Sequence, residues 1–337
     1  MNVKKILFSI GLIAFLPLTT YAADLRLTTS PLPINLKVEP SNSISTPIKI
    51  KNDGITSENI KVSLMKFKAD SNTGTPTLSE REPGDSYFDW ATFSDNTFTL
   101  PANEWKTITA NFEVPTTASF GYYYAVVFSR AEENVEKNDR QTIINGGTAV
   151  LILLEATVPN AKREITVTDF SVDKKMYEFL PATFSIKLRN SGNVHIAPRG
   201  NIFISQGNNK DVAILEVNPN KGSLLPDSPR DFQESWSDGF PYYVAKEVDN
   251  KTVLDENNNP IKELKWDFKD ASKLRWGKYT AKLLLVYDDG KKDVPVEAVV
   301  EFWVMPWRLI FGSIGILVGF FFAGRLSNKI SFKKKKK

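Results

Sequence analysis

The sequence contains no cysteine and one histidine, His195, among its 337 residues. The lack of cysteine excludes disulfide bonds, thiolate metal sites and cysteine nucleophiles, and a single imidazole cannot form a multi-histidine metal centre. The sequence also lacks a glycine-rich phosphate-binding loop and a Gly-x-Ser-x-Gly nucleophile motif. We therefore expect no cofactor, no metal ion and no enzymatic activity.

Two acidic pairs are the only candidate catalytic groups that remain. Asp85 is close in sequence to Asp89, and Asp288 is followed by Asp289. A polysaccharide-processing enzyme would need two such carboxylates about 5–10 Å apart in a cleft. Both pairs fall in predicted turns, where carboxylates are usually solvated.

Basic residues are concentrated at the two ends of the chain, although the net charge is +4. Residues 1–23 carry two lysines and residues 307–337 carry eight basic groups, and neither segment has an acidic residue. Residues 24–306 therefore contain 33 basic and 39 acidic residues. This acidic central region lacks the basic surface that binds phosphates, so we expect no nucleic-acid partner.

Both ends carry membrane-targeting features. At the N-terminus, Lys4 and Lys5 precede an apolar run over residues 6–18 and a small residue, Ala22, which predicts a signal peptide over residues 1–22. An uncleaved anchor is the alternative. At the C-terminus, residues 309–324 form an apolar stretch without a charged residue between Arg308 and Arg325, which predicts a transmembrane helix over 307–326. A buried core helix is the alternative there.

The lysine-rich segment 327–337 predicts the topology of the protein. Basic residues next to a membrane helix stay on the cytoplasmic side. We therefore expect a single-pass protein of the cell membrane, with its N-terminal ectodomain outside the cell. Gly315, Gly319 and Ala323 repeat at four-residue spacing on the helix, which is compatible with a helix–helix homodimer or with chance.

The ectodomain shows the two-residue periodicity of β-strands. Ile48 and Ile50 alternate with polar residues, and so do Ile60, Val62 and Leu64. Three landmarks then occur twice in the same order: a strand that ends in asparagine, a Leu-Pro turn and a Gly-x-Tyr-x-Ala strand start (48–52, 100–101 and 121–125; 186–190, 225–226 and 277–281). The sequence thus predicts an all-β ectodomain of two tandem immunoglobulin-like β-sandwich domains, residues 23–160 and 161–306.

The Gly-x-Tyr landmark has a known structural role in immunoglobulin-like sandwiches. A tyrosine near the start of the sixth strand returns its hydroxyl to the backbone and forms a tyrosine corner. Tyr123 and Tyr279 are the candidates for this role.

The second predicted domain carries an aromatic insertion at about residues 237–275. A long loop on a rigid sandwich is a common place for a binding surface. We therefore take five aromatic residues in and beside it as candidate ligand-binding residues: Trp236, Phe240, Tyr242, Tyr243 and Trp266. Alternatively, these side chains form a small core of their own.

Several of these features together resemble one protein family. They are the signal peptide, the tandem domains, the segment 101–129, the Asn190-Ser191-Gly192-Asn193 turn and the C-terminal span with its lysine tail. In these features the chain resembles bacterial WxL-interacting-type surface proteins. The resemblance implies a peptidoglycan-binding first domain and a partner-binding second domain, although the insertion departs from the usual second domain.

Two functions follow from this reading. The first is a non-enzymatic, membrane-anchored surface protein that binds cell-wall glycan or another surface protein. The alternative is a chaperone or assembly factor for exported surface proteins, which would pair a free strand edge with a strand of its client.

Overall fold

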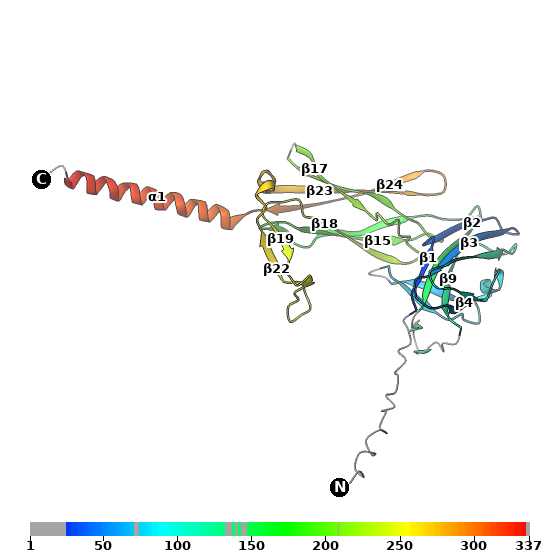
Figure 1. Cartoon of the computed structure of the whole chain (residues 1–337). Helices are drawn as coiled ribbons and strands as arrows, with labels where there is room; N and C mark the ends of the chain where they lie inside the picture. The colour runs from blue at the N-terminus through cyan, green and yellow to red at the C-terminus, as the bar shows by residue number, and fades with distance from the viewer. Residues whose placement is uncertain are drawn as a thin grey trace, which may run out of the picture.

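The computed structural model describes residues 25–70, 74–131, 137–138, 141–142, 147–207 and 209–334. The predicted signal peptide and the last three lysines lie outside these residues. The chain forms two β-sandwiches followed by one long helix (Figure 1). The predicted fold class, two tandem immunoglobulin-like sandwiches with a C-terminal helix, is therefore confirmed.

Domain 1 packs two sheets face to face. The first, the β1 sheet, has the order β1 (Leu27–Ser30), β3 (Ser43–Asn52), β8 (Trp105–Glu113), β6 (Ala91–Phe93). The second, the β12 sheet, has the order β2 (Ile34–Val38), β12 (Thr148–Ala156), β9 (Phe120–Arg130), β4 (Glu58–Ala69), β5 (Pro76–Ser79), and β7 (Thr97–Leu100) also pairs with β4. A short 3₁₀ helix, η1 (Ser86–Trp90), precedes β6, and β10 (Lys137–Asn138) pairs with β11 (Gln141–Thr142).

Domain 2 is also a two-sheet sandwich. One sheet has the order β13 (Ile165–Val172), β15 (Ala182–Asn190), β18 (Pro229–Trp236). The other has the order β14 (Met176–Tyr177), β24 (Asp293–Val304), β23 (Gly277–Asp288), β16 (Arg199–Gln206), β17 (Asn209–Val217). The insertion lies between β18 and β23 and contains β19 (Tyr242–Ala245), β20 (Glu247–Val248), β21 (Lys251–Thr252), β22 (Lys262–Lys265) and the 3₁₀ helix η2 (Phe268–Lys273).

Each sandwich encloses its own apolar core. In domain 1, the alternating residues Ile48 and Ile50 of β3 are fully buried against Ile108 of β8. In domain 2, Phe184 of β15 and Tyr279 of β23 have the same role. Alternation brings every second side chain to the core, which is why the period-two pattern predicted these strands.

The tyrosine-corner prediction is wrong by one residue in domain 1. The Tyr123 ring lies on the outer face of the β12 sheet, folded over Gly121, and its hydroxyl lies near the His195 backbone of domain 2 and not inside the domain 1 core. The Tyr122 hydroxyl instead accepts a hydrogen bond from the backbone N–H of Ser119, at 3.0 Å. Because a shift of one residue moves a side chain to the opposite face of a strand, the Gly-x-Tyr spacing alone selects the wrong tyrosine. Tyr279, by contrast, lies inside the domain 2 core.

The C-terminal helix α1 (Trp307–Lys334) extends beyond the predicted end at residue 326. Lysine favours helix, so the basic segment continues the helix as far as residue 334. Its portion Trp307–Arg325 is long and apolar enough to cross a membrane. Gly315, Gly319 and Ala323 are exposed on it, and the homodimer that they suggest stays a prediction.

Candidate binding groove between the two domains

The β12 sheet of domain 1 is apolar on both faces. Val150, Ile152 and Leu154 of β12 point into the domain 1 core. Their neighbours Leu151 and Leu153 point outward, beside further apolar side chains from β4 and β9: Met65, Phe67, Ala125 and Val127. An outer sheet face that is this apolar is expected to pack against another surface, because large apolar patches usually mark interaction sites.

Domain 2 covers part of this outer face. Leu225, in the loop before β18, is buried in one cluster with Met65, Phe67 and Leu153. The rest of the face borders an open groove with a volume of about 460 Å³. We call it the interdomain groove; its apolar walls include Leu32, Phe67, Leu78, Leu151 and Leu225.

A strand edge that has no pairing strand among the described residues borders the interdomain groove. β12 pairs with β9 along its whole length, but with β2 only from Ile152 to Ala156. Among the described residues, no strand pairs with the other edge of β12 from Thr148 to Leu151. An unpaired edge of this kind offers backbone N–H and C=O groups to another chain.

Prolines explain why β2 begins only at Ile34 and leaves the first part of β12 unpaired among the described residues. Pro33 directly precedes Ile34, the first residue of β2 that pairs with β12, and Pro31 lies two residues earlier. A proline has no backbone N–H and cannot donate to a ladder. The Ser30-Pro31-Leu32-Pro33 segment therefore leaves the sheet, and Leu32 and Pro33 line the groove.

A cation lies at the domain 2 side of the groove. The Arg230 guanidinium packs close to Gly74 of domain 1 and Gly222 of domain 2, at positions where a Cβ atom would meet it within about 2.6 Å. Its Nη1 donates to the Ser223 carbonyl at 3.0 Å, but its buried Nε has no hydrogen-bond partner in the described chain. Burial lowers the pKa of Arg230, although an arginine stays charged at neutral pH.

A polar cluster also links the two domains across the same face of the β12 sheet. Glu155 of β12 is almost fully buried and forms an ion pair with Arg163, which precedes β13. The rings of Tyr123 and His195 meet edge to face, with centroids 5.9 Å apart. Burial lowers the pKa of His195 to about 4, and the nearby Glu155 offsets only part of this effect. His195 is therefore neutral near pH 7, and it lies in the domain junction.

The five aromatic residues predicted as a ligand site do not form one site. Trp236 is 1% exposed and packs against Tyr279 and Phe302 in the core of domain 2, so its assignment as a binding residue is wrong. Trp236 is the last residue of β18, and alternation directs it inward.

The other four residues belong to the insertion. Phe240 is buried under Trp266, with ring centroids 5.7 Å apart. Tyr242 and Tyr243 are half-buried on β19, and the Tyr243 hydroxyl donates to Glu178 at 3.4 Å. Of the five, only Trp266 is strongly exposed, at 45%. A ligand role for these four residues stays a prediction.

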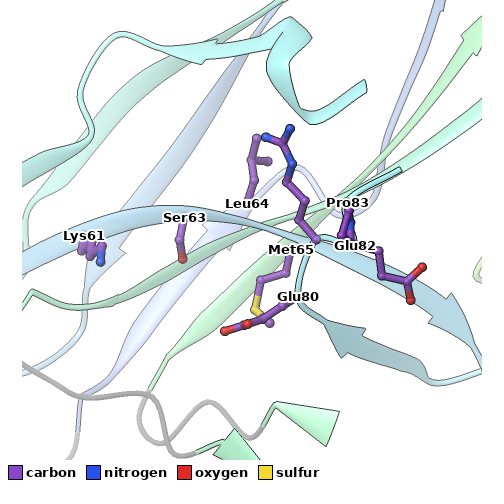
Figure 2. A pocket seen from close by; sticks show the side chains of 8 residues that line it. Lys61, Ser63, Leu64, Met65, Glu80, Glu82 and Pro83 are labelled. Atoms are coloured by element: carbon purple, nitrogen blue, oxygen red, sulfur yellow. The ribbon is translucent and has the colours of Figure 1, made fainter. Parts of the chain in front are cut away.

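A second, more polar pocket of about 520 Å³ lies along β4. Figure 2 shows its lining, which comes from β4 (Ser63, Leu64) and from the segment before η1 (Glu80, Pro83). It borders the short stretch of β4 that lies between its pairings with β7 and β5. A strand of only a few residues fits there, so this pocket is a weaker candidate than the interdomain groove.

The acidic pairs do not form an obvious catalytic dyad. Asp85 pairs with Lys66 at 2.9 Å, and Asp89 pairs with Arg81 at 2.5 Å. The Arg81 side chain lowers the pKa of Asp89. Hydrogen bonds from the Lys292 and Lys291 backbone lower the pKa of Asp289 in the same way, as is usual for a carboxylate that closes a turn.

Sequence reasoning missed the interdomain groove. The available signals were the Ser30-Pro31-Leu32-Pro33 segment, which interrupts a strand, and the run of apolar residues on both faces of β12. A strand that is apolar on both faces indicates cover on both sides. The sequence does not indicate that the cover on one side is incomplete.

Comparisons with known proteins find similarity of structure only. No family model matches the chain, and no curated protein matches its sequence. Three solved structures illustrate the similar folds. The class 5 fimbriae chaperone CfaA is 15% identical with a TM-score of 0.37, and the match covers 81% of this chain and 98% of that one. For the CsuC–CsuE chaperone–adhesin pre-assembly complex of Acinetobacter baumannii the identity is 12%, the TM-score 0.35 and the coverage 81% and 97%. For the Pseudomonas aeruginosa CupB2 chaperone these values are 7%, 0.34, 82% and 100%. At these values the comparisons carry no argument about function, which must come from the groove itself.

Proposed function

We propose that this protein is a membrane-anchored chaperone or assembly factor that binds an extended segment of an exported surface protein in the interdomain groove. The observation that carries the proposal is the edge of β12 from Thr148 to Leu151, which no strand of the described residues pairs and which borders an apolar groove. A backbone edge next to an apolar groove is the arrangement used in recognition by strand addition.

The bound segment would continue the line of β2 along β12. Its backbone would hydrogen-bond to β12, and every second side chain would point toward the outer face of the sheet. On that face, Leu32 and Leu151 line the groove. The groove therefore favours segments with apolar residues at alternate positions, which is the pattern of a β-strand that has not yet found its own sheet.

Arg230 adds a polar contact at the end of this site. Its side chain lines the groove, and no carboxylate of the described residues lies within 4 Å of its guanidinium. A backbone carbonyl or carboxylate of the bound segment would accept a hydrogen bond from an accessible N–H of the guanidinium. Because a hydrogen bond to a charged group contributes about 1.5–3 kcal/mol, this contact would add to affinity.

The proposal includes the anchor and the orientation expected from the sequence. The α1 segment Trp307–Arg325 suits a membrane span, and the basic residues after it favour a cytoplasmic C-terminus. The groove would then face the outside of the membrane, where exported proteins emerge. That the protein is not an enzyme, that it binds cell-wall glycan, and that it belongs with WxL-interacting-type proteins all stay predictions from the sequence.

A peptide-binding titration tests the proposal. The probe is a fluorescein-labelled decapeptide with valine at alternate positions and serine between them, added to the full chain in detergent micelles. The control peptide has proline at each serine position, which removes every second backbone N–H and disfavours pairing as a strand. We expect the first peptide to raise fluorescence anisotropy with a saturable curve and the second not to.

Two matched variants assign the binding to the groove. Leu151→Arg places a charge in the groove and is expected to weaken binding about tenfold or more. Ile214→Arg makes the same change at a residue of β17 that is 54% exposed and outside the groove, so it should leave binding unchanged. Equal binding by both variants, or no binding of the alternating peptide to the unaltered chain, would overturn the proposal.

A further inference from the structure

The membrane-proximal end of domain 2 exposes several large aromatic side chains. Within the insertion and the residue that precedes β23, Phe268 is 74% exposed, Trp276 is 67% exposed and Trp266 is 45% exposed. Two more tryptophans, Trp303 near the end of β24 and Trp307 at the start of α1, are 41% and 44% exposed. Aromatic residues of this size are usually buried unless they contact something.

The strand register places these residues beside the start of α1. Gly277, which follows Trp276, pairs with Val304 at the end of β24, and α1 begins only three residues after Val304. Met305 donates its backbone N–H to the Tyr177 carbonyl at 2.7 Å, which ties the junction to the body of domain 2. Figure 1 shows β19 and β22 of the insertion at the same end of domain 2, where α1 leaves the sandwich.

The insertion holds its aromatic rings in place. Asp238 forms ion pairs with Lys273 and with Arg275, each at 2.8 Å, and these span the two ends of the insertion. The Phe240 backbone N–H also donates to the Lys273 carbonyl at 3.0 Å. With Phe240 buried beneath them, the Trp266 and Phe268 rings stack at a centroid distance of 6.2 Å and stay exposed.

We propose that Trp266, Phe268 and Trp276 form a second membrane contact, which lies in the headgroup region of the bilayer beside the α1 span. Tryptophan rings favour this region because they combine an apolar body with a polar N–H group, and phenylalanine contributes apolar area there. Trp276 precedes Gly277, which pairs with Val304 between Trp303 and Trp307. These two tryptophans precede or begin the span, so the bilayer is the partner that the position of the surface favours. The inference requires that α1 spans the membrane, and it is independent of the interdomain groove.

This contact would fix the orientation of the ectodomain. A single helix leaves the domains above it free to tilt and rotate, whereas a second contact point limits both motions. The rigid strand β23 runs from Gly277 at this surface to Asp288. The membrane contact would therefore hold domain 1, and the groove, at a defined height above the bilayer.

Depth-dependent quenching tests the proposal. The chain has no cysteine, so each variant Phe268→Cys, Trp276→Cys, Leu317→Cys or Ile55→Cys carries one nitrobenzoxadiazole label. The full chain is reconstituted into phosphatidylcholine vesicles with or without lipid that bears a nitroxide near the headgroup. Leu317 lies within the span, and Ile55 is 88% exposed in domain 1. The label at 268 or 276 is expected to lose about half of its emission, as a label at interfacial depth does, and the label at 55 almost none.

Each other outcome contradicts the proposal. In one outcome, the labels at 268 and 276 behave like the label at 55, and the label at 317 responds to a nitroxide placed deeper in the acyl chain. This result would show a spanning helix without the second contact. A label at 317 that does not respond would remove the span on which the contact depends. If soluble peptidoglycan fragments change the emission of the label at 268 and the lipid nitroxide does not, the aromatic surface binds glycan and not the bilayer. Trp266→Cys provides a second site on the same surface if either test variant is unstable.

Discussion

Asn52 in domain 1 and Asn190 in domain 2 form the same set of hydrogen bonds. The Asn52 Nδ2 group donates to the carbonyls of Thr56 and Leu100, at 2.7 and 3.1 Å, and its Oδ1 atom accepts from the Gly54 N–H. The Asn190 Nδ2 group donates to the carbonyls of Val194 and Leu224, at 2.8 and 3.0 Å, and its Oδ1 atom accepts from the Gly192 N–H. Both side chains are fully buried. Each asparagine joins the end of one strand to a distant turn, so the internal repeat extends to hydrogen-bond geometry.

The same bonds correct the alignment of the repeat. Leu100 corresponds to Leu224, because each carbonyl accepts a hydrogen bond from the asparagine of its domain. Asn103 then corresponds to Asp227, and these two residues have positive φ angles of 62° and 52°. The two Leu-Pro turns are therefore offset by one residue, so that Leu225 lies where domain 1 has Pro101. This offset has a structural use, because Leu225 is the residue that domain 2 inserts into the apolar face of domain 1.

Removal of either asparagine should destabilise its domain strongly. Asn52→Ala and Asn190→Ala each remove three hydrogen bonds of a fully buried side chain, which should cost about 3 kcal/mol or more of the free energy of unfolding. Urea titration of the full chain in detergent micelles measures the loss. Asn35→Ala, at an exposed position of β2, is the control and should change stability by less than about 0.5 kcal/mol. Equal effects at all three positions would contradict the assigned role.

The buried ion pair at the domain junction should behave non-additively. Glu155→Gln and Arg163→Met each leave one charge without its partner in a buried site, with an expected cost of about 3–5 kcal/mol. The double variant removes both charges and should cost less than the sum of the two single changes. A double-mutant cycle by urea unfolding measures this coupling energy, and additive losses would show that the pair contributes nothing as a pair.

The stability of the protein should fall in mild acid because of His195. Its pKa is about 4 in the folded chain and 6.5 in the reference state, so between these values the unfolded chain binds a proton that the folded chain does not. Stability is therefore complete above pH 6.5 and decreases as the pH falls toward 4, by about 2 kcal/mol at pH 5. Thermal unfolding at pH 7.5 and pH 5 of the unaltered chain and of His195→Gln measures this contribution. The expected result is a smaller pH dependence in His195→Gln, and an identical dependence would contradict it.

Two tryptophans near the insertion should respond differently to truncation. Trp236→Ala opens a cavity among Tyr279, Phe302 and the Arg275 guanidinium, and it should cost about 3–5 kcal/mol. Trp266→Ala removes a ring that is 45% exposed and should cost less than about 1 kcal/mol. Urea unfolding of both variants provides the comparison. A larger loss for Trp266→Ala would mean that the insertion has a core role.

The candidate site was less accessible to prediction than the fold. Strand alternation around Ile48 and Ile60 and the two strands that end in Asn52 and Asn190 were readable because they are local features, with partners that lie within a few residues. The groove depends on the position at which β2 stops pairing with β12 and on how far Leu225 reaches across the outer face of domain 1. These are contacts between residues more than 70 positions apart in sequence, and no local pattern specifies how completely one surface covers another.

The sequence by itself determined the class of the fold, the two-domain repeat, the acidic charge balance of residues 24–306 and the apolar C-terminal segment, because hydrophobic periodicity and charge act along the chain. The tertiary structure decided which tyrosine returns its hydroxyl to the backbone, which tryptophan is core and where the open edge lies. A shift of one residue in strand register reverses the face on which a side chain lies. Tyr122 and Tyr123, adjacent in sequence, therefore lie on opposite faces of one sheet, and only the paired strands determine which face is the core.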